Sequence, residues 1–239
     1  MMFRTIRRVA RRFGLEIAGA RPETSAALRM QLLLRTRRID LVLDVGAHRG
    51  QYGRWLREIG YRGMIVSIEP QPQLQPVLVR GARHDPQWRV LPPLALGDHD
   101  GSAELHLAAN EESSSLAEML PAHRVAAPQA SYVGMTPVQV RRLDSLAPAL
   151  LGQAQSPLLK LDVQGYEARV LAGAARSLAQ FSALQLEVAL TPLYAGELTL
   201  GPMLADLERR GFGLHSLTPG FSDRRDGRTL QVDALFVRL

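Results

Sequence analysis

Residues 41–51 read LVLDVGAHRGQ, an apolar run of strand length that passes into a turn with two glycines and then into a helical pattern. Glycine has no Cβ, so the backbone of such a turn can adopt positive φ angles and can approach a ligand closely. The helix that follows offers its N-terminal N–H groups to the same ligand. The stretch therefore predicts the first strand, turn and helix of an open α/β sheet, with a binding site at the turn. Its candidate binding residues are Asp44, Gly46, His48, Gly50 and Gln51.

The same alternation of short apolar runs and helical patterns continues from residue 39 to the C-terminus. This pattern is typical of an α/β domain with a largely parallel sheet and helices on both faces. The expected strands are 41–45, 64–69, 88–94, 158–163 and 183–188, and the expected helices are 51–59, 72–83, 167–179 and 201–210. Runs at 213–217 and 230–237, joined by a turn-rich segment, predict an antiparallel closing pair. One domain is therefore expected over residues 39–239, preceded by an arm of residues 1–38.

A polar insert at about 101–146 interrupts this alternation. It holds a strand-like run at 103–108, three consecutive serines, a proline-containing segment and a second strand-like run at 138–142. A polar insert of this length in a compact domain is usually a lid or a binding loop, so we expect it beside the active site. The hydroxyls of Ser113, Ser114 and Ser115 are candidate contacts for a polyhydroxylated substrate.

The spacing of the glycines discriminates between two kinds of cofactor. A dinucleotide-binding turn has the pattern G-x-G-x-x-G, whereas this turn reads D-x-G-x-x-x-G from residue 44. A carboxylate at Asp44 would repel a pyrophosphate and would attract the ammonium and sulfonium groups of S-adenosylmethionine. Glu69 follows the turn by about 20 residues, where an acidic residue can accept hydrogen bonds from ribose hydroxyls. Gly97 and Asp98 follow a third strand, and the Asp98 carboxylate is a candidate acceptor for the adenine amino group.

Several motifs beyond this turn carry a resemblance to a known family. They read DVGAHRG at 44–50, IEP at 68–70, LGDHDG at 96–101, SSSL at 113–116, LDSL at 143–146, KLDVQGYE at 160–167 and LEVAL at 186–190. In these motifs the chain resembles the FkbM family of S-adenosylmethionine-dependent methyltransferases over about residues 39–239. The resemblance implies a class I methyltransferase fold, which is Rossmann-like, with a mostly parallel seven-stranded sheet and an antiparallel C-terminal strand. His48 stands where the family more often has asparagine.

Two acidic residues are the candidate catalytic groups. Asp162 ends the fourth expected strand and Glu187 lies in the fifth, so both belong to the carboxyl edge of the sheet, where ligands bind in α/β folds. Amine and base methyltransferases of this fold often have an Asn-Pro-Pro-Tyr type sequence where this chain has Asp-Val-Gln-Gly, which disfavours a nucleobase nitrogen as the methyl acceptor. Asp162 can act as general base, or Asp162 and Glu187 can hold a divalent cation such as Mg²⁺ that lowers the hydroxyl pKa.

The expected reaction is therefore methyl transfer to a hydroxyl of a sugar, a glycan precursor or a secondary metabolite. An RNA methyltransferase that uses the basic arm is an alternative enzyme, and a non-catalytic cofactor-binding module is an alternative without turnover. The sequence does not indicate the oligomeric state.

Positive charge is concentrated in the arm. Residues 1–38 hold ten arginines and two acidic residues, whereas the remaining 201 residues have a net charge of −2. Apolar residues recur at three- and four-residue steps between these arginines, which is typical of a basic amphipathic helix. Packing of the apolar stripe on the domain, peripheral contact with an anionic membrane and binding of RNA are the open interpretations.

Composition excludes several other classes of protein. The chain has no cysteine, which excludes disulfide scaffolds and thiolate metal sites. No apolar run reaches the roughly 18 to 20 residues that a membrane-spanning helix needs. Arginines, a glycine and a glutamate interrupt any apolar run that could serve as a secretory signal. We therefore expect a protein of the bacterial-type cytoplasm or of the inner membrane face.

Overall fold

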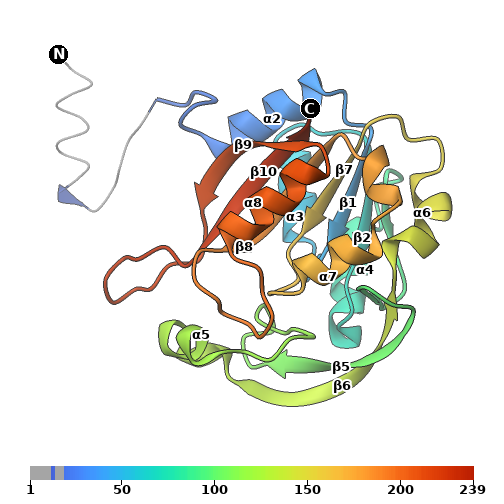
Figure 1. The fold of residues 1–239 in the computed structure, drawn as a ribbon. Helices are drawn as coiled ribbons and strands as arrows, with labels where there is room; N and C mark the ends of the chain where they lie inside the picture. The colour runs from blue at the N-terminus through green and yellow to red at the C-terminus, as the bar shows by residue number, and fades with distance from the viewer. Residues whose placement is uncertain (1–11, 14–18) are drawn as a thin grey trace.

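Two β-sheets organise the protein, for which a computed structural model describes residues 12–13 and 19–239 (Figure 1). The amphipathic helix predicted within the basic arm falls almost wholly outside the described residues. The main sheet has seven strands in the order β3-β2-β1-β7-β8-β10-β9, and the small sheet has three in the order β4-β6-β5. No helix of the described chain is long and apolar enough to cross a membrane.

The main sheet is formed by β1 (Leu41–Val45), β2 (Met64–Ile68), β3 (Trp88–Val90), β7 (Pro157–Leu161), β8 (Ala183–Ala189), β9 (Phe212–Pro219) and β10 (Gln231–Arg238). All pairs among β1, β2, β3, β7 and β8 are parallel, whereas β10 is antiparallel to both β8 and β9. Every residue of β1 and of β7 is buried, as expected for strands covered on both faces. The predicted class I methyltransferase fold is confirmed by this sheet.

Helices cover the two faces of the main sheet and bury different sets of strand residues. The helices are α2 (Ala26–Thr36), α3 (Gln51–Glu58), α4 (Gln75–Ala82), α6 (Leu143–Leu151), α7 (Glu167–Gly173) and α8 (Leu200–Arg209), with short 3-10 helices at Pro72–Leu74, Pro128–Ala130 and Ser177–Gln180. One core cluster joins α2, α3 and α4 to one face, and a larger one joins α6, α7 and α8 to the other. Ser25 caps α2 by accepting a hydrogen bond from the Leu28 N–H at 3.4 Å.

The polar insert forms most of the small sheet. Strand β5 (Gly101–Ala108) pairs antiparallel with β6 (Tyr132–Arg141), and β6 pairs in parallel with the short β4 (Ala95–Leu96). Between β5 and β6 lie the serine run and α5 (Pro121–Ala126). In Figure 1 this sheet lies below the carboxyl ends of the parallel strands of the main sheet. The insert is therefore a folded layer rather than a simple loop.

Two predicted elements are shorter than expected. The strand expected at 88–94 ends at Val90, because the prolines at 92 and 93 cannot donate to a strand ladder, and pairing resumes only in β4. The helix expected at 167–179 ends at Gly173, which packs so closely against the Gly97 carbonyl that no Cβ would fit there. That close contact joins α7 to the segment that leads into the insert.

Candidate active site

Polar side chains take the place of apolar ones toward the carboxyl ends of the central strands, on the sheet face that α2 and α3 cover. Side chains two residues apart in a strand point to the same face. On this face lie Lys160 of β7 and, just past the end of that strand, Asp162. Gln185 and Glu187 of β8 and Asp233 of β10 continue the polar surface.

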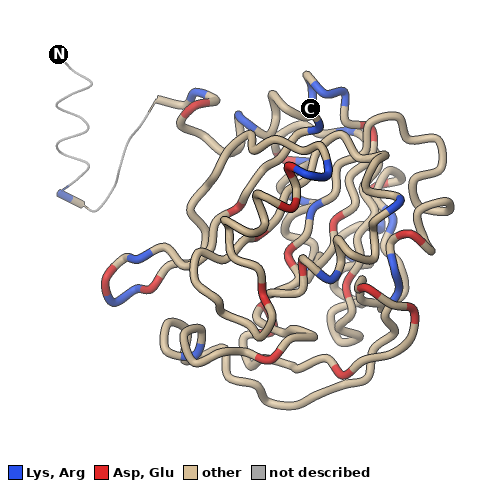
Figure 2. The backbone as a smooth tube through the Cα atoms, in the orientation of Figure 1, with Lys and Arg blue, Asp and Glu red and all other residues tan. Residues whose placement is uncertain are grey.

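The strand register arranges these side chains in rows across the sheet. One row consists of Lys160, Gln185, Leu235 and Ser216, and the next consists of Glu187, Asp233 and Thr218. Both rows form the floor of a cavity of about 550 Å³, which is a typical volume for a small-molecule site. The turn after β1, the end of β2, the insert and helices α2 and α3 provide its walls. Figure 2 shows acidic positions where the main sheet approaches the insert.

The turn after β1 has the backbone conformation that its glycines predict. Gly46 has a φ of 74° and lies against the main chain of Asp162, where a Cβ would collide with the carbonyl oxygen. Gly50 has a φ of 83° and is the N-terminal cap residue of α3. His48 lies between them with a φ of 49°, which is uncommon for a residue with a side chain. Gly46, His48 and Gln51 line the cavity.

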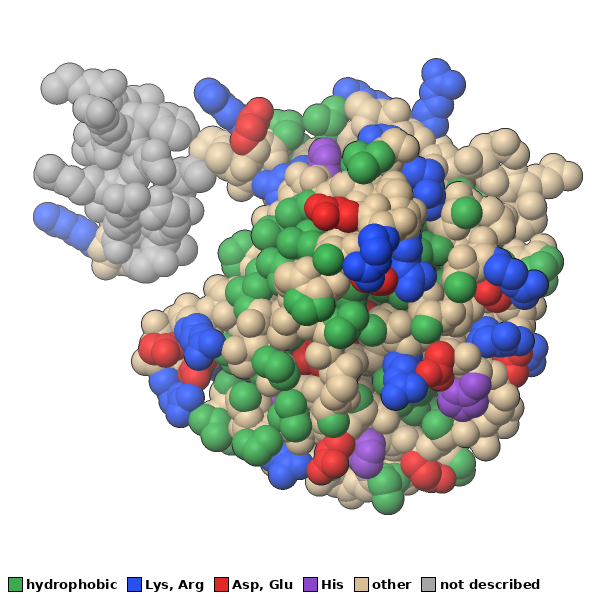
Figure 3. All heavy atoms as spheres, in the orientation of Figure 1, with side chains coloured by type: hydrophobic (Ala, Val, Ile, Leu, Met, Phe, Trp, Pro, Cys, Tyr) green, Lys and Arg blue, Asp and Glu red, His purple; other side chains and the backbone are tan. Residues whose placement is uncertain are grey.

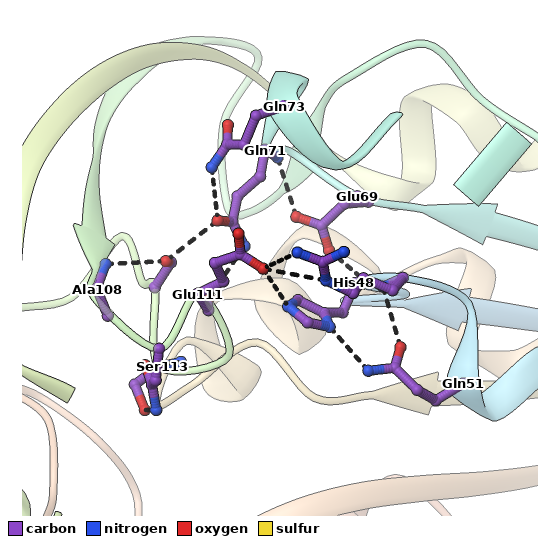
Figure 4. A network of polar contacts seen from close by, with 11 residues as sticks. His48, Gln51, Glu69, Gln71, Gln73, Ala108, Glu111 and Ser113 are labelled. Atoms are coloured by element: carbon purple, nitrogen blue, oxygen red, sulfur yellow. Dashed lines mark hydrogen bonds and ion pairs between the residues drawn. The ribbon is translucent and has the colours of Figure 1, made fainter. Parts of the chain in front are cut away.

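Glu69 lies directly after β2 and organises this turn (Figure 4). One carboxylate oxygen accepts a hydrogen bond from the His48 N–H at 2.7 Å, and the other accepts one from the Gln71 N–H at 2.9 Å. The residue is only 3% exposed, and burial raises the pKa of its carboxyl group. Each oxygen uses one acceptor position in these bonds and retains another for a ligand.

The hydrogen bonds of Gln51 fix the protonation of the His48 ring. The Gln51 amide oxygen accepts from the Arg49 N–H at 3.0 Å, so its amide nitrogen is the donor to His48 Nδ1 at 2.9 Å. Burial lowers the pKa of the imidazole, which is therefore neutral with its proton on Nε2. That atom has no hydrogen-bond partner among the described residues, and the carboxylate of Glu111 lies 3.7 Å from it.

Asp44 is placed beneath the cavity rather than in its lining. Its side chain is fully buried, accepts from Ser67 Oγ at 3.2 Å and lies 3.2 Å from Lys160 Nζ. Lys160 Nζ also donates to the Gly46 carbonyl at 2.9 Å and lies 3.4 Å from Asp162. Although burial disfavours the charged amine, the carboxylates of Asp162 and Asp44 raise the pKa of Lys160 above its ordinary value. The only lysine of the chain thus joins the two carboxylates to the glycine turn.

Gln164 links the two candidate catalytic acids. Its amide nitrogen donates to Asp162 at 2.9 Å and to Glu187 at 2.7 Å, while its amide oxygen accepts from the Tyr194 hydroxyl at 2.8 Å. The backbone of Gln164 has a φ of 55°, a left-handed conformation that the neighbouring Gly165 shares. Gln164 was not among the predicted site residues, although it stands between a strand end and a glycine in the motif at 160–167.

The environments of Asp162 and Glu187 differ. The Asp162 side chain is 40% exposed, toward the cavity, and is paired with Lys160. Burial raises the pKa of Glu187 well above its ordinary value, and the nearby Asp162, Glu167 and Asp233 act in the same direction. No cluster of three or more histidine, aspartate or glutamate side chains suited to a metal ion occurs within residues 12–13 and 19–239. Binding of Mg²⁺ by the pair stays a prediction.

The three serines connect the insert to the main domain. Ser113 is buried and exchanges hydrogen bonds with Asn110, and its carbonyl oxygen lies 3.3 Å from the Tyr194 hydroxyl. Ser114 Oγ donates to Gln71 at 3.3 Å. Ser115 Oγ donates to the Gln164 carbonyl at 2.6 Å and accepts from the Ala117 N–H at 2.9 Å. Ser114 and Ser115 line the cavity, and Ser113 lies behind them.

Replacing Ser115 with alanine is expected to destabilise the protein by about 1–2 kcal/mol, because it leaves the buried Gln164 carbonyl and Ala117 N–H unpaired. For a chain of this size the thermal midpoint should fall by roughly 2–8 °C. Thermal unfolding followed by circular dichroism would measure this change, with the exposed Ser102→Ala variant as the matched control. Equal midpoints in the two variants would contradict a connecting role for Ser115.

Gly97 and Asp98 lie beside the cavity and are absent from its lining. Gly97 packs against Val140 and Tyr166, with little room for a Cβ. Asp98 pairs with His99 at 2.9 Å and with Arg169 at 2.7 Å, and these two contacts lower the pKa of its carboxyl group. The chain just before them, at 94–96, does reach the cavity. A contact between Asp98 and adenine stays a prediction.

A second contact joins the insert to the turn after β1 (Figure 4). The Arg49 guanidinium donates to Glu111 through Nη2 at 2.7 Å and through Nε at 3.1 Å. The Glu111 carbonyl accepts from the Gln71 side chain at 3.2 Å, and Glu111 itself has a φ of 62°. Together with the serine contacts, this ion pair places the insert across the end of the cavity that Glu69 and His48 line.

Solved structures similar to this chain include several methyltransferases. One is magnesium protoporphyrin IX methyltransferase from Synechocystis with bound S-adenosylmethionine, at 12% identity and a TM-score of 0.49, covering 91% of this chain and 80% of that one. Another is an rRNA methylase from Streptococcus thermophilus, at 10% identity and a TM-score of 0.49, covering 93% of this chain and 99% of that one. A third is Aeropyrum pernix fibrillarin with natively bound S-adenosylmethionine, at 12% identity and a TM-score of 0.47, covering 83% of this chain and 66% of that one.

The amino-acid sequence shows the family to which the chain belongs. No curated protein matches the chain significantly. The model of the methyltransferase FkbM domain matches residues 44–214. This range is most of the chain and includes the turn after β1, the insert and both candidate catalytic acids. The chain therefore belongs to the FkbM methyltransferase family, as its motifs predicted.

Proposed function

We propose that the protein transfers a methyl group from S-adenosylmethionine to a hydroxyl of a sugar, a glycan precursor or a secondary metabolite. The observation that carries the proposal is a single cavity whose lining includes the turn after β1, Glu69 and Asp162. Members of this family are methyltransferases, and two of the structures described above hold S-adenosylmethionine. The cofactor half of the cavity would be the end lined by Gly46, His48 and Glu69.

The charge of the cavity suits this cofactor. Its described lining carries the carboxylates of Glu69, Glu112, Asp162, Glu187 and Asp233, and the cations of Arg29 and Lys160. An excess of acidic groups favours a positively charged ligand such as this cofactor. On the face shown in Figure 3, arginines and acidic side chains are mixed, and no continuous basic surface is visible. The mixed charge of this face favours a small hydroxylated acceptor over RNA.

The residues of the site can perform the proton transfer that a hydroxyl acceptor needs. When bound, S-adenosylmethionine supplies a methyl group on a positively charged sulfur. As the acceptor oxygen forms its bond to the methyl carbon, the carbon–sulfur bond breaks and its electron pair stays on sulfur. Asp162 would take the hydroxyl proton, because it faces the cavity and is paired with Lys160. Gln164 holds Asp162 and Glu187 in fixed positions for this step.

Calorimetric titration with S-adenosylmethionine and with its demethylated product S-adenosylhomocysteine is the direct test. We expect both to bind with one site per chain. Incubation with methyl-labelled cofactor and a panel of glycosides, amines and RNA should then give label on a hydroxyl. Absence of binding by the folded protein would contradict the cofactor assignment, and label found only on an amine or on RNA would contradict the oxygen assignment.

A further inference from the structure

The half of the cavity away from the glycine turn has its own set of side chains, which the cofactor assignment does not use. Its floor is formed by side chains of β8, β10 and β9, and these strands lie on the opposite side of β7 from β1 and β2. Its walls include Tyr52 and Trp55 of α3 and Arg29 of α2. This half therefore presents aromatic rings, hydroxyl and amide groups, the carboxyl groups of Glu187 and Asp233, and one guanidinium.

Arg29 has only neutral partners in the described chain. Its guanidinium donates to the carbonyls of Pro22 and Glu23 at 3.2 and 3.3 Å, and to the Thr218 hydroxyl at 3.3 Å. These bonds hold the side chain at the cavity wall. No carboxylate of the described residues forms an ion pair with its guanidinium. Arginine in such a position is well suited to a bidentate contact with a carboxylate or a phosphate.

The distance from Arg29 to the candidate catalytic acids matches a small saccharide. Thr218, which contacts Arg29, stands in the same row as Asp233 and Glu187. Strands in a sheet are about 4.8 Å apart, so the strand position of Thr218 lies about 10 Å from that of Glu187 and about 14 Å from Asp162, which follows β7. A ligand that presents a hydroxyl to Asp162 can therefore reach Arg29 with a substituent at its far end.

The groups between these two points suit a polyhydroxylated ring. The Tyr52 and Trp55 rings are adjacent, with centroids 5.5 Å apart, and provide an apolar wall for the carbon face of a sugar. Gln185 and Asp233 on the floor offer hydrogen bonds to hydroxyls.

We infer that this half of the cavity binds an anionic saccharide acceptor whose carboxylate or phosphate pairs with Arg29 while a hydroxyl faces Asp162. The inference rests on the proposed function and narrows its substrate class from hydroxyl compounds in general to sugars with a negatively charged substituent. It also gives Arg29 a role in acceptor specificity.

The test uses the full chain saturated with S-adenosylhomocysteine and three probes: methyl glucoside, methyl glucuronide and methyl glucoside 6-phosphate. Ligand-observed saturation-transfer NMR gives the Kd of each probe. We expect at least one charged probe to bind about 10-fold more tightly than the neutral glycoside, because a charge-assisted contact with Arg29 adds to its binding. Preference for the glucuronide would identify a carboxylate as the natural substituent, and preference for the phosphate would identify a phosphate.

Arg29→Gln should reduce the preference for the charged probe over the neutral glycoside to about twofold or less. Arg35→Gln, an exposed position on the same helix, should retain the preference. The thermal midpoint and S-adenosylhomocysteine affinity of both variants verify that they are folded. Equal binding of the three probes, no binding of any probe, or a preference that survives Arg29→Gln would overturn this inference and leave the proposed function intact. Failure of the wild-type protein to bind S-adenosylhomocysteine would instead overturn the proposed function.

Discussion

Glu69→Ala is expected to weaken binding of S-adenosylhomocysteine by at least about 100-fold, because the proposed placement of the ribose gives its hydroxyls two charge-assisted hydrogen bonds to this carboxylate, which the variant would lose. Hydrogen bonds to a charged group contribute about 1.5–3 kcal/mol each, and 2.7 kcal/mol corresponds to a factor of about 100. The product is the better probe, since it binds without turnover. Isothermal titration of the wild-type and variant proteins measures the change.

Glu69 also holds the N–H groups of His48 and Gln71, so the variant needs controls for folding. Glu58→Ala, an exposed glutamate on α3, is the matched control and should bind as the wild type does. Glu69→Gln retains the shape of the side chain and should show an intermediate affinity. Wild-type affinity in Glu69→Ala, with an unchanged circular dichroism spectrum, would contradict the placement of the ribose at this residue.

Glu167→Gln is expected to stabilise the protein at pH 8 and to have little effect on stability below about pH 4. Glu167 lies in the first turn of α7, is 3% exposed and accepts from the Val163 N–H at 2.9 Å. Burial raises its pKa from 4.5 to about 8. The folded protein therefore keeps this carboxyl protonated at neutral pH, whereas the unfolded chain ionises it.

The sign of the effect follows from this difference. Between about pH 4.5 and pH 8 the unfolded state loses the Glu167 proton and the folded state retains it, so this group lowers the free energy of unfolding as pH rises. Glutamine does not titrate, so the advantage of the variant should grow across this range to about 3–5 kcal/mol. Urea unfolding at pH 4, 6 and 8 measures it, with the exposed Glu208→Gln as control. Parallel pH curves for Glu167→Gln and wild type would refute the prediction.

The sheet and the turn after β1 could be predicted because local sequence determines them. The stretch 41–51 contains an apolar strand, two glycines with positive φ and a helix, and each of these signals is independent of the rest of the chain. The motif at 160–167 likewise identified the position of Asp162. The prolines at 92 and 93 also indicate that the strand expected at 88–94 ends early.

The remainder of the site depends on contacts between distant segments. Gln164 meets Tyr194 across 30 residues, and Asp233 stands beside Glu187 only because β10 pairs antiparallel with β8 in one register. No local pattern specifies that register. Asp44 was expected to face the cofactor, and its complete burial under Lys160 depends on the pairing of β1 with β7.

The candidate contacts for the cofactor and those for the acceptor lie on different strands of the main sheet. The residues assigned to the cofactor follow β1 and β2, whereas Ser216 and Thr218 belong to β9, the last strand at the other edge of the sheet. An edge strand has one neighbour, so substitutions there disturb fewer contacts than substitutions in a central strand. Changes in β9 and α2 are therefore expected to alter acceptor preference while methyl-donor binding stays intact, and the same positions are the first choice for engineering a new acceptor preference.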